Sequence, residues 1–394
     1  MESSAKGLPR GVRRHRAVYS ILGWGLGWLI CLIFGFRARY TKIKSPTFLF
    51  LANHTSDLDP IYEVLGTKRH LRFVASENAL RGFGGAIVSY LAGPIPRRKG
   101  ASADECVDAI LANLRAGVNV GIHPEGNRTW DGETGYIPPR IARVAKDSGA
   151  GLVTYRLDGG YLRTPRWARF GRRGLTRGQL VNEYSAETLA SMSEGEIYDA
   201  ICRDLYVDAF EEQKKSPRAY PGRKRAERLE LVLFVCPVCG KIGSFVSRGD
   251  GVACRECGLK TRYDEFGFFD KAVPFKNLLD WSRWQKSWLR ENAPSLAAQT
   301  DEELTYDENV RLTCGVGRAK KLLAEGALCR VFGDRIELGG FVFLHSGFEK
   351  MSAFRWSTIC FTFEGEYYEI FSNRGLSGQK YYGLWRIITG KDYF

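Results

Sequence analysis

The sequence of 394 residues has few histidines, no internal repeat and no low-complexity segment. The missing repeat argues against stacked-repeat architectures, and the hydrophobic content of 44% argues against wholesale disorder. With only five histidines, any chemistry that needs an imidazole depends on a small set of positions. Acidic residues are outnumbered, 44 against 58 lysines and arginines, so the chain carries a net charge of +14. Such a chain is attracted to nucleic acid, anionic membrane or phosphorylated substrates.

A disulfide framework is also missing, because six of the ten cysteines are scattered singly. The other four form two C-x-x-C pairs, Cys236/Cys239 and Cys254/Cys257, with 14 residues between the pairs. Four thiolates at this spacing bind Zn²⁺ tetrahedrally and leave no open position for catalysis. We expect a structural zinc ribbon over residues 228–265 and a reducing compartment. Zinc would supply stability that so small a module cannot get from its own core. Zinc ribbons can bind nucleic acid or protein, and the sequence does not indicate which.

One long apolar run, residues 17–36, contains no charge. At about 1.5 Å per residue, about 20 residues can cross a hydrocarbon core. No small-residue cleavage site follows the run, and basic residues flank both of its ends, so a positive-inside asymmetry is missing. Its tryptophans and glycines suit a spanning helix or one that lies at the interface; the remaining alternative is a buried helix of a soluble domain. We expect residues 1–45 to anchor the chain to a membrane.

The rest of the chain divides by pattern into further regions. Apolar strand patterns alternate with helical ones over residues 46–215, which predicts an α/β domain built on βαβ units. A basic, proline-containing stretch then reads as a linker, and residues 275–292 form an amphipathic helical pattern. Residues 300–394 contain short strand patterns and one closing helix, so we expect a mostly-β domain there. In pattern alone it resembles a pleckstrin-homology-like fold, and its ligand, lipid or protein, does not follow from the fold.

His54 and Asp59 stand five residues apart in the stretch FLANHTSDLDP. His54 follows an apolar strand pattern, and the carboxyl ends of strands are where α/β sheets place their sites. An imidazole suits general-base work near neutral pH, and a carboxylate fixes its tautomer. Two plainer readings remain open: Asp59 is a good helix N-cap before Pro60, and Asp57 is a competing partner for His54.

Two other loops carry polar groups that suit a phosphorylated substrate. In GIHPEGNRTWDG, Gly126 lets the backbone come close to a ligand, Glu125 is suited to bind a hydroxyl, and the planar fork of Arg128 is suited to bind phosphate. In GPIPRRKG a rigid loop presents three consecutive cations to an anionic head group. Each loop alone also fits an ordinary turn or a solvated surface.

Together, in this order, the three stretches resemble the glycerolipid acyltransferase family, of which 1-acylglycerol-3-phosphate acyltransferase is the best-known member. NHTSDLD matches the family block N-H-x4-D, and HPEGNRT matches the block F-P-E-G-x-R-S. GPIPRRK and GLVTYRL match the second and fourth blocks loosely. The resemblance covers about residues 46 to 180.

The resemblance implies a role for each matching residue. His54 would take the proton from the free hydroxyl of a lysophospholipid, and Asp59 would orient His54. The hydroxyl would attack the thioester of acyl-CoA or acyl-carrier protein directly, without an acyl-enzyme. The residues expected to bind the substrate are Arg97, Arg98 and Lys99 at the phosphate, and Glu125, Gly126 and Arg128 around the acceptor.

The sequence departs from the family pattern at three of these positions. His123 stands in place of the usual phenylalanine, Asn127 in place of threonine and Lys99 in place of arginine, which leaves the acceptor open. After the matched blocks, residues 161–178 contain six arginines with aromatic residues between them. We expect this segment either to be a solvated face or to contact anionic head groups.

The sequence therefore predicts a membrane-attached enzyme at the cytoplasmic face of the cell membrane. It would transfer a fatty acyl group to a lysophospholipid, 1-acylglycerol-3-phosphate first of all, to give phosphatidic acid in phospholipid biosynthesis. Its partners would be the lipid substrate, acyl-CoA or acyl-carrier protein, and an anionic membrane surface; nucleic acid and an organic cofactor are not expected. The alternative is a regulatory protein that binds nucleic acid or protein through its zinc ribbon and carries a degenerate acyltransferase domain.

Overall fold

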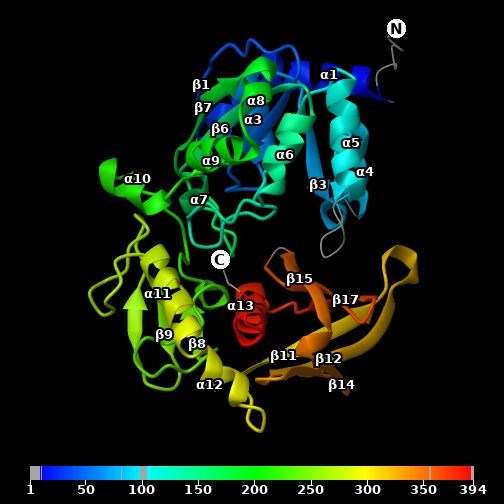
Figure 1. Ribbon diagram of the computed structural model, residues 1–394. Coiled ribbons are helices and arrows are strands. Elements are labelled where there is room, and N and C mark those ends of the chain that lie inside the picture. Colours follow the sequence, from blue (N-terminus) through cyan, green and yellow to red (C-terminus); the bar gives the residue numbers. More distant parts are fainter. Residues whose placement is uncertain (1–8, 10, 81, 98–103, 355, 392–394) are drawn as a thin grey trace. The chain divides into compact units, whose positions relative to one another are not determined.

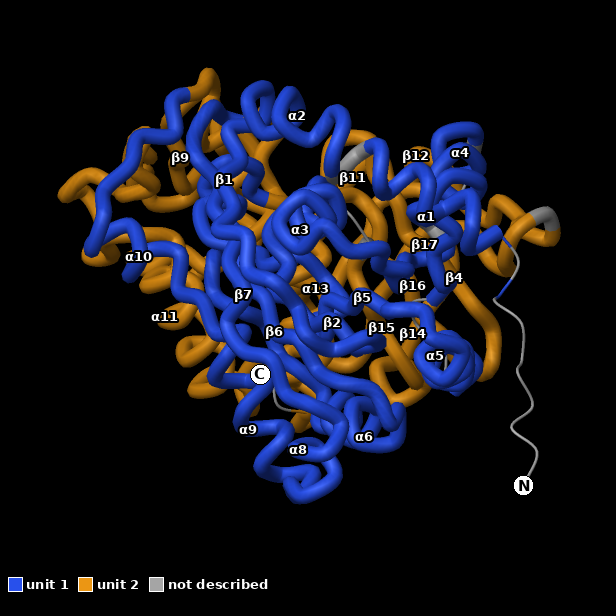
Figure 2. The backbone as a smooth tube through the Cα atoms, turned by 90° about the horizontal axis from the view of Figure 1, so that it is seen from above, with its two compact units in different colours: residues 1–98, 102–165, 172–221 blue, residues 99–101, 166–171, 222–394 orange. Residues whose placement is uncertain are grey.

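The structure is a computed structural model that describes residues 9, 11–80, 82–97, 104–354 and 356–391 (Figure 1). The chain forms two compact units (Figure 2). Unit 1 comprises residues 1–98, 102–165 and 172–221, and unit 2 comprises residues 99–101, 166–171 and 222–394. The division into a membrane segment, an enzyme domain, a ribbon and a C-terminal domain stays a prediction.

Unit 1 contains one seven-stranded sheet in the order β1-β7-β6-β2-β5-β3-β4. Five strands run parallel to one another, while β7 is antiparallel to β6 and pairs in parallel with β1 at the edge. The sheet is therefore mixed α/β. Its strands are β1 Phe36–Arg39, β2 Phe48–Ala52, β3 Arg72–Ser76, β4 Ile95–Arg97, β5 Val120–Ile122, β6 Gly151–Asp158 and β7 Thr176–Tyr184.

Helices cover both faces of this sheet, and each face has its own apolar core. The helices of unit 1 are α1 Val12–Ser20, α2 Gly27–Ile33, α3 Asp59–Thr67, α4 Gly82–Ala92, α5 Asp104–Arg115, α6 Arg140–Asp147, α7 Gly160–Arg163, α8 Ala186–Ser191, α9 Glu194–Leu205 and α10 Ala209–Lys215. Helices α5, α6 and α9 supply one core, and α3 supplies the other.

Strand β2 shows why the sheet forms where it does. All five of its residues are fully buried, as expected for a parallel strand between two helical layers. Leu49 and Leu51 enter the core that contains α5, α6 and α9, and Phe48 and Phe50 enter the core that contains Tyr62 of α3. Because side chains alternate along a strand, β2 fills both cores and ends abruptly at the polar residues that follow it.

The N-terminal apolar run forms a helix that continues through a π-helical segment between α1 and α2. Residues Val12–Ile33 are long and apolar enough to cross a membrane. Tyr19 at its start is buried, but most large apolar side chains after it are exposed, with Trp24 67%, Trp28 70% and Leu32 74% exposed. This exposure contradicts the alternative of a buried soluble helix. Helix α4, which contacts α1, presents Phe83 at 85% exposure.

In its described residues, unit 2 contains two antiparallel sheets and three α-helices. The smaller sheet has the order β10-β9-β8, and the larger has the order β14-β13-β12-β11-β17-β16-β15. The elements are β8 Phe245–Arg248, β9 Gly251–Cys254, β10 Lys260–Arg262, α11 Leu278–Glu291, α12 Ala293–Ala298, β11 Thr305–Cys314, β12 Lys321–Val331, β13 Arg335–Leu338, β14 Phe341–Leu344, β15 Phe348–Phe354, β16 Thr358–Phe363, β17 Glu366–Phe371 and α13 Gly378–Ile388. The C-terminal region is thus an antiparallel sheet followed by a closing helix.

The cysteine module and the C-terminal sheet share one apolar core. Phe234 and Val235, directly before the first cysteine pair, belong to the same buried cluster as Leu289 of α11 and Leu384 of α13. Buried Gln285 of α11 holds this segment, because its Oε1 accepts from the backbone N–H groups of residues 234 and 235 at 2.7 and 2.9 Å. The two predicted modules therefore lie in one compact unit.

Two regions differ from the expectations drawn from the sequence. The stretch 214–228 was expected to be a linker, and the boundary between the units, Pro221/Gly222, does lie within it, but Tyr220 and Ala226 on either side are buried. The arginine-rich segment was expected to face solvent or lipid, yet Arg166 and Arg172 are only 4% exposed. Arg172 donates to the Leu162 carbonyl at 3.3 Å, so hydrogen bonding to the backbone replaces solvation there.

Candidate active site

His54 follows β2 at the carboxyl edge of the unit 1 sheet. Its Nδ1 lies 3.0 Å from Oδ2 of Asp59, the first residue of α3. The His54 side chain is 20% exposed and the Asp59 side chain is completely buried. When Nδ1–H donates to the carboxylate, the lone pair of the imidazole is on Nε2, which is the tautomer that a general base needs.

The loop between β2 and α3 is folded around the Asp59 carboxylate. Oδ2 accepts from the backbone N–H of Thr55 at 2.5 Å and of Ser56 at 2.8 Å, and Oδ1 accepts from the Thr55 hydroxyl at 3.0 Å. Burial raises the pKa of the Asp59 carboxyl, while His123 and these N–H donors lower it. The aspartate therefore closes the turn before α3 and orients His54. The expected role as helix N-cap is wrong, because α3 begins at Asp59 itself and its N-cap is Leu58.

Two further side chains fix the loop that carries His54. The side chain of Asn53 forms two hydrogen bonds with the backbone of Leu157 in β6, at 2.9 and 2.8 Å. Glu125 accepts from the His54 backbone N–H at 2.8 Å and from the Gly135 N–H at 2.6 Å. Burial raises the pKa of Glu125 to about 8. Glu125 thus joins two loops, and its expected contact with a substrate hydroxyl stays a prediction.

The remaining residues of the third block lie around the same loop. Arg128 is mostly buried, and its Nε lies 3.3 Å from Oδ1 of Asp57, which is 85% exposed. Asp57 therefore pairs with Arg128, while Asp59 pairs with His54. Gly126 has a φ of +68°, which favours glycine, and no atom lies within 4 Å of the place of an added Cβ. The backbone is accessible at this turn.

A second imidazole–carboxylate pair lies against the first. Nε2 of His123 is 2.9 Å from Oε1 of Glu63, and both side chains are nearly or fully buried. The ring of His123 stacks on that of His54 with a centroid distance of 4.0 Å and an interplanar angle of 12°. Burial lowers the pKa of His123, but Glu63 and the other nearby carboxylates outweigh burial and raise it above its ordinary value. Glu63 is missing from the sequence-based site.

A signal for Glu63 does exist in the sequence. It lies four residues after Asp59 in α3, hence one turn along on the same helical face. It is also a charge among the apolar residues of that helix. A charged residue on the inner face of an apolar helix needs a partner, and the departure from the family pattern at His123 supplies one.

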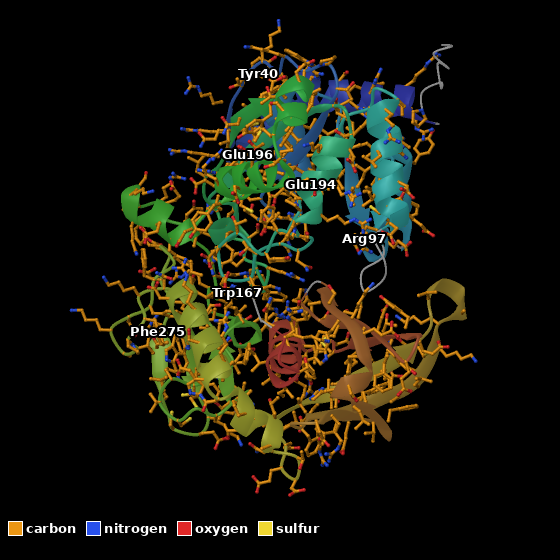
Figure 3. All side chains as sticks on the ribbon, viewed as in Figure 1. Tyr40, Arg97, Trp167, Glu194, Glu196 and Phe275 are labelled. Atoms are coloured by element: carbon orange, nitrogen blue, oxygen red, sulfur yellow. The ribbon has the colours of Figure 1, made fainter. Side chains whose placement is uncertain are left out.

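The predicted phosphate loop is only partly described. Arg97 is the last residue of β4, labelled in Figure 3, and its register partner is Ser76 at the end of β3. Because β4 and β3 run parallel to β5 and β2, Arg97 lies at the same carboxyl edge of the sheet as His54. Arg98 and Lys99 lie outside the described residues, so their expected contact with phosphate stays a prediction.

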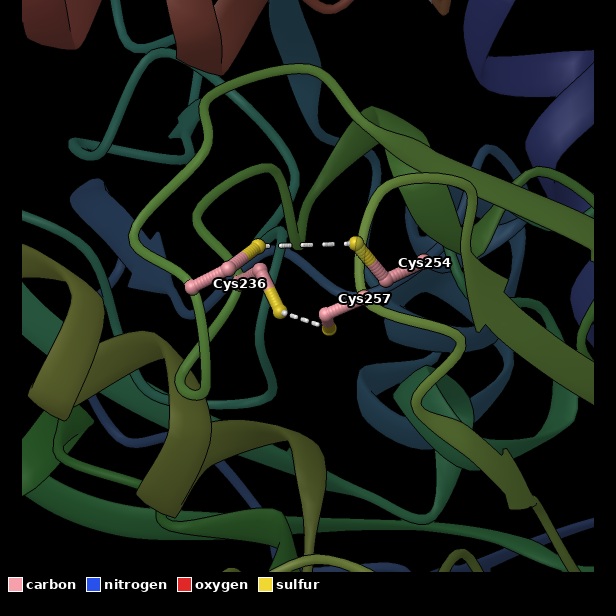
Figure 4. A group of neighbouring side chains, drawn as sticks. Cys236, Cys254 and Cys257 are labelled. Atoms are coloured by element: carbon pink, nitrogen blue, oxygen red, sulfur yellow. Dashed lines mark hydrogen bonds between the residues drawn. The ribbon is translucent and has the colours of Figure 1, made fainter.

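The four paired cysteines of unit 2 come together (Figure 4). Their sulfur atoms all lie within 4.8 Å of one another. Cys236 and Cys257 are 3.6 Å apart, and Cys239 and Cys254 are 3.8 Å apart. Four thiols that converge in this way fit a metal ion such as zinc. Each C-x-x-C turn ends in a glycine with positive φ, Gly240 and Gly258, whose N–H donates to the first cysteine of its pair.

Comparisons with known proteins identify a family for the part of unit 1 that contains this site. Residues 37–157 match the Acyltransferase family, so this stretch is an acyltransferase domain. No curated protein sequence matches the chain. Among solved structures, the chain resembles the 1-acyl-sn-glycerophosphate (LPA) acyltransferase PlsC from Thermotoga maritima, with 19% identity and a TM-score of 0.42 over 51% of this chain and 80% of that chain.

Proposed function

We propose that the acyltransferase domain transfers a fatty acyl group from acyl-CoA or acyl-carrier protein to the free hydroxyl of a lysophospholipid, with 1-acylglycerol-3-phosphate as the first candidate and phosphatidic acid as the product. The observation that carries the proposal is the His54 imidazole, 3.0 Å from buried Asp59, inside the matched domain. The charge of +14 and the exposed apolar helix suit an anionic lipid substrate.

In the proposed reaction His54 Nε2 takes the hydroxyl proton while the hydroxyl oxygen attacks the thioester carbonyl carbon. Asp59 stays ionised and stabilises the imidazolium. The tetrahedral adduct then collapses, the C–S bond breaks, and the thiolate takes the proton back from His54. Protons and charge balance over the cycle, and no acyl-enzyme forms. We assign phosphate binding to Arg97, Arg98 and Lys99, and acceptor binding to Glu125, Gly126 and Arg128, as parts of this proposal.

The direct test is turnover of purified, detergent-solubilised protein with lysophosphatidic acid and a labelled acyl donor. We expect His54→Ala to lose about 10³-fold or more in kcat, the effect of removing a general base, while its thermal unfolding stays close to that of the wild type. Equal activity of the two proteins would remove His54 as the base. Inactivity on every lysolipid, combined with tight and salt-dependent binding of DNA or RNA, would favour the regulatory alternative.

We also propose that the four cysteines hold one structural Zn²⁺. Four thiolates fill a tetrahedral shell, so zinc would stabilise the fold of unit 2 and would not take part in acyl transfer. Elemental analysis should give about one zinc per chain for the wild type and none for Cys254→Ser. Cys202→Ser is the matched control, since Cys202 lies in α9 of unit 1, and it should keep its zinc. Zero zinc in wild-type protein that was never exposed to a chelator would refute the assignment.

The apolar helix and the C-terminal sheet complete the proposal. We propose that residues 12–33 attach the enzyme to the cytoplasmic face of the cell membrane, because the exposed tryptophans Trp24 and Trp28 suit a lipid interface. Flotation with lipid vesicles should weaken when both are changed to serine, and unchanged flotation would argue against this attachment. For the C-terminal sheet and α13 we propose a pleckstrin-homology-like fold that binds lipid or protein.

A further inference from the structure

Unit 1 contains a cleft of about 840 Å³ that neither the motifs nor the proposed acceptor site uses. Its floor is the edge of the sheet formed by β6, β7 and β1, and its walls come from the end of α9 and from α10. The strand register places two rows of side chains on the same face of the sheet. One row consists of Asp158, Arg177 and Arg37. The other row consists of Arg156, Gln179 and Arg39.

The cleft is strongly basic, since seven arginines and lysines line it against four aspartates and glutamates. Some of these cations are already neutralised within the protein. Arg218 donates to Asp158 at 2.9 Å, and Lys215 donates to Glu212 at 3.1 Å. A net positive charge remains, which would attract an anion into the cleft.

Three arginines of the floor account for that excess. Among the described residues, the side chains of Arg37, Arg39 and Arg177 form no hydrogen bond and no ion pair. Arg37 is also the register partner of Arg177 on the neighbouring strand. Strands lie about 4.8 Å apart, and like charges placed directly opposite each other are destabilising. A multiply charged anion between the two guanidinium groups would turn this repulsion into attraction, with bidentate contacts to phosphate.

The cleft adjoins the candidate active site. Val207 lines both the cleft and the small pocket that contains His54. Leu157 lines that pocket, and the next residue, Asp158, lines the cleft. Beside Val207, Tyr206 is 48% exposed and lines the cleft, and its aromatic ring is a surface on which a base can stack.

We propose that this cleft binds the phosphates of a nucleotide-bearing thioester, the phosphorylated end of the acyl donor. The inference rests on the proposed function for the identity of the donor. The ligand has two features that the cleft matches, several phosphates at Arg37, Arg39 and Arg177 and an aromatic base at Tyr206. Val207, which lines both sites, gives the direction from the cleft toward His54 for its thioester end.

The test is calorimetric binding of adenosine 3′,5′-bisphosphate to the full chain in detergent. We expect binding that weakens as salt is added, and a loss of about 100-fold in the double variant Arg37→Gln/Arg177→Gln, about tenfold for each charged contact. Arg115→Gln/Arg143→Gln removes the same charge from exposed positions of α5 and α6, and it should bind like the wild type. In turnover, the double variant should raise the KM for acyl-CoA and change kcat little.

The outcomes separate this inference from the proposed function. Equal bisphosphate affinity in the double variant and the wild type would overturn the cleft assignment. If the double variant keeps its bisphosphate binding but loses binding to phosphatidylglycerol vesicles, the assignment is also overturned, because the arginines would then bind lipid head groups. His54→Ala should bind the bisphosphate as tightly as the wild type. If the wild type binds the bisphosphate at the cleft but acylates no lysolipid, the cleft assignment stands and the proposed reaction is refuted.

Discussion

The two imidazole–carboxylate pairs of unit 1 differ in the ring nitrogen that they use, Nδ1 in His54 and Nε2 in His123, and in their surroundings. His54–Asp59 and His123–Glu63 have nearly equal distances, 3.0 and 2.9 Å, and both carboxylates come from α3. Asp59 also accepts two backbone N–H groups and a hydroxyl, whereas Oε2 of Glu63 is buried with no hydrogen-bond partner. The His54 side chain is 20% exposed, and that of His123 is 8% exposed.

This difference indicates separate tasks for the two pairs. A carboxylate that accepts several N–H donors is stabilised as an anion, so Asp59 can hold the His54 tautomer while the exposed ring exchanges a proton with a substrate. Burial raises the pKa of Glu63, and nearby carboxylates raise that of His123. Both shifts favour the protonated forms of this inner pair, His123–Glu63, and the ring of His123 stacks on that of His54.

The largest expected effect on activity comes from breaking the outer pair, His54–Asp59. Asp59→Asn keeps the size of the side chain but turns an amide toward His54, which disfavours the tautomer with the lone pair on Nε2. We expect kcat to fall by about 10³- to 10⁴-fold, measured by acyl transfer to lysophosphatidic acid. Asp57→Asn changes an exposed carboxylate two residues away and should stay within a few-fold of the wild type. A similar loss in both variants would contradict the assigned partner.

The inner pair should affect stability more than chemistry. His123→Phe leaves Glu63 buried without a partner and should cost about 3 to 5 kcal/mol of unfolding free energy, measured by denaturant unfolding. The double variant His123→Phe/Glu63→Leu replaces the pair with apolar side chains of similar size and should recover most of that loss. Its kcat should stay within about tenfold of the wild type. If the losses of His123→Phe and of a second single variant, Glu63→Leu, simply add up in the double variant, the two residues are not a coupled pair.

A third carboxylate, Glu125, should make stability depend on pH. Burial raises its pKa to about 8 from an ordinary value of 4.5. Its contribution to stability is therefore full below about pH 4.5 and is lost as the pH rises toward 8. We expect the Tm of the wild type to fall over this range by a few degrees more than that of Glu125→Gln, which cannot titrate.

The glutamine variant should also start from a lower Tm, because an amide oxygen replaces only one of the two acceptors that bind His54 and Gly135. Parallel Tm curves for the two proteins would show that Glu125 is not the titrating group. Glu63 and His123 also have raised pKa values, so a smaller slope of the same sign should remain in the variant.

The smallest effect is expected at the basic cleft, outside both pairs. Arg177→Gln removes one of two like charges that face each other across β1 and β7. Without ligand, the Tm should rise by about 1 to 2 °C, which corresponds to a few tenths of a kcal/mol. The matched variant Arg143→Gln, on α6, should not raise it. A lower Tm in Arg177→Gln would mean that this guanidinium already stabilises the folded protein.

Local pattern was enough to place several parts of the molecule. The apolar run Phe48–Ala52 forms the buried strand β2, so His54 lies at the carboxyl edge of a sheet as expected. The two C-x-x-C turns converge as their spacing indicated. In both cases the residues that form the feature lie close together in the chain, so local backbone geometry was enough to predict their positions.

Pairing between distant segments was the part that sequence alone did not reveal. Strand β1 lies directly behind the apolar run and pairs with β7 some 140 residues later in the chain. Strand β7 contains TRGQLVNEY, whose residues are mostly polar and only partly buried, so no strong alternation marks it. The basic cleft depends on this pairing, and so does the meeting of Arg37 with Arg177. Glu63 was missed for a related reason, because its partner His123 is 60 residues away.

The short connection between α2 and β1 has a consequence for how substrates arrive. Only Phe34 and Gly35 separate the exposed apolar helix from the strand that carries Arg37 and Arg39. Such a link allows little independent movement. In the proposed membrane-attached enzyme, the depth of the helix in the bilayer would therefore also set the height of Arg37 and Arg39 above the lipid surface. A water-soluble donor would then reach the enzyme by diffusion in three dimensions, and a lipid acceptor by diffusion in two.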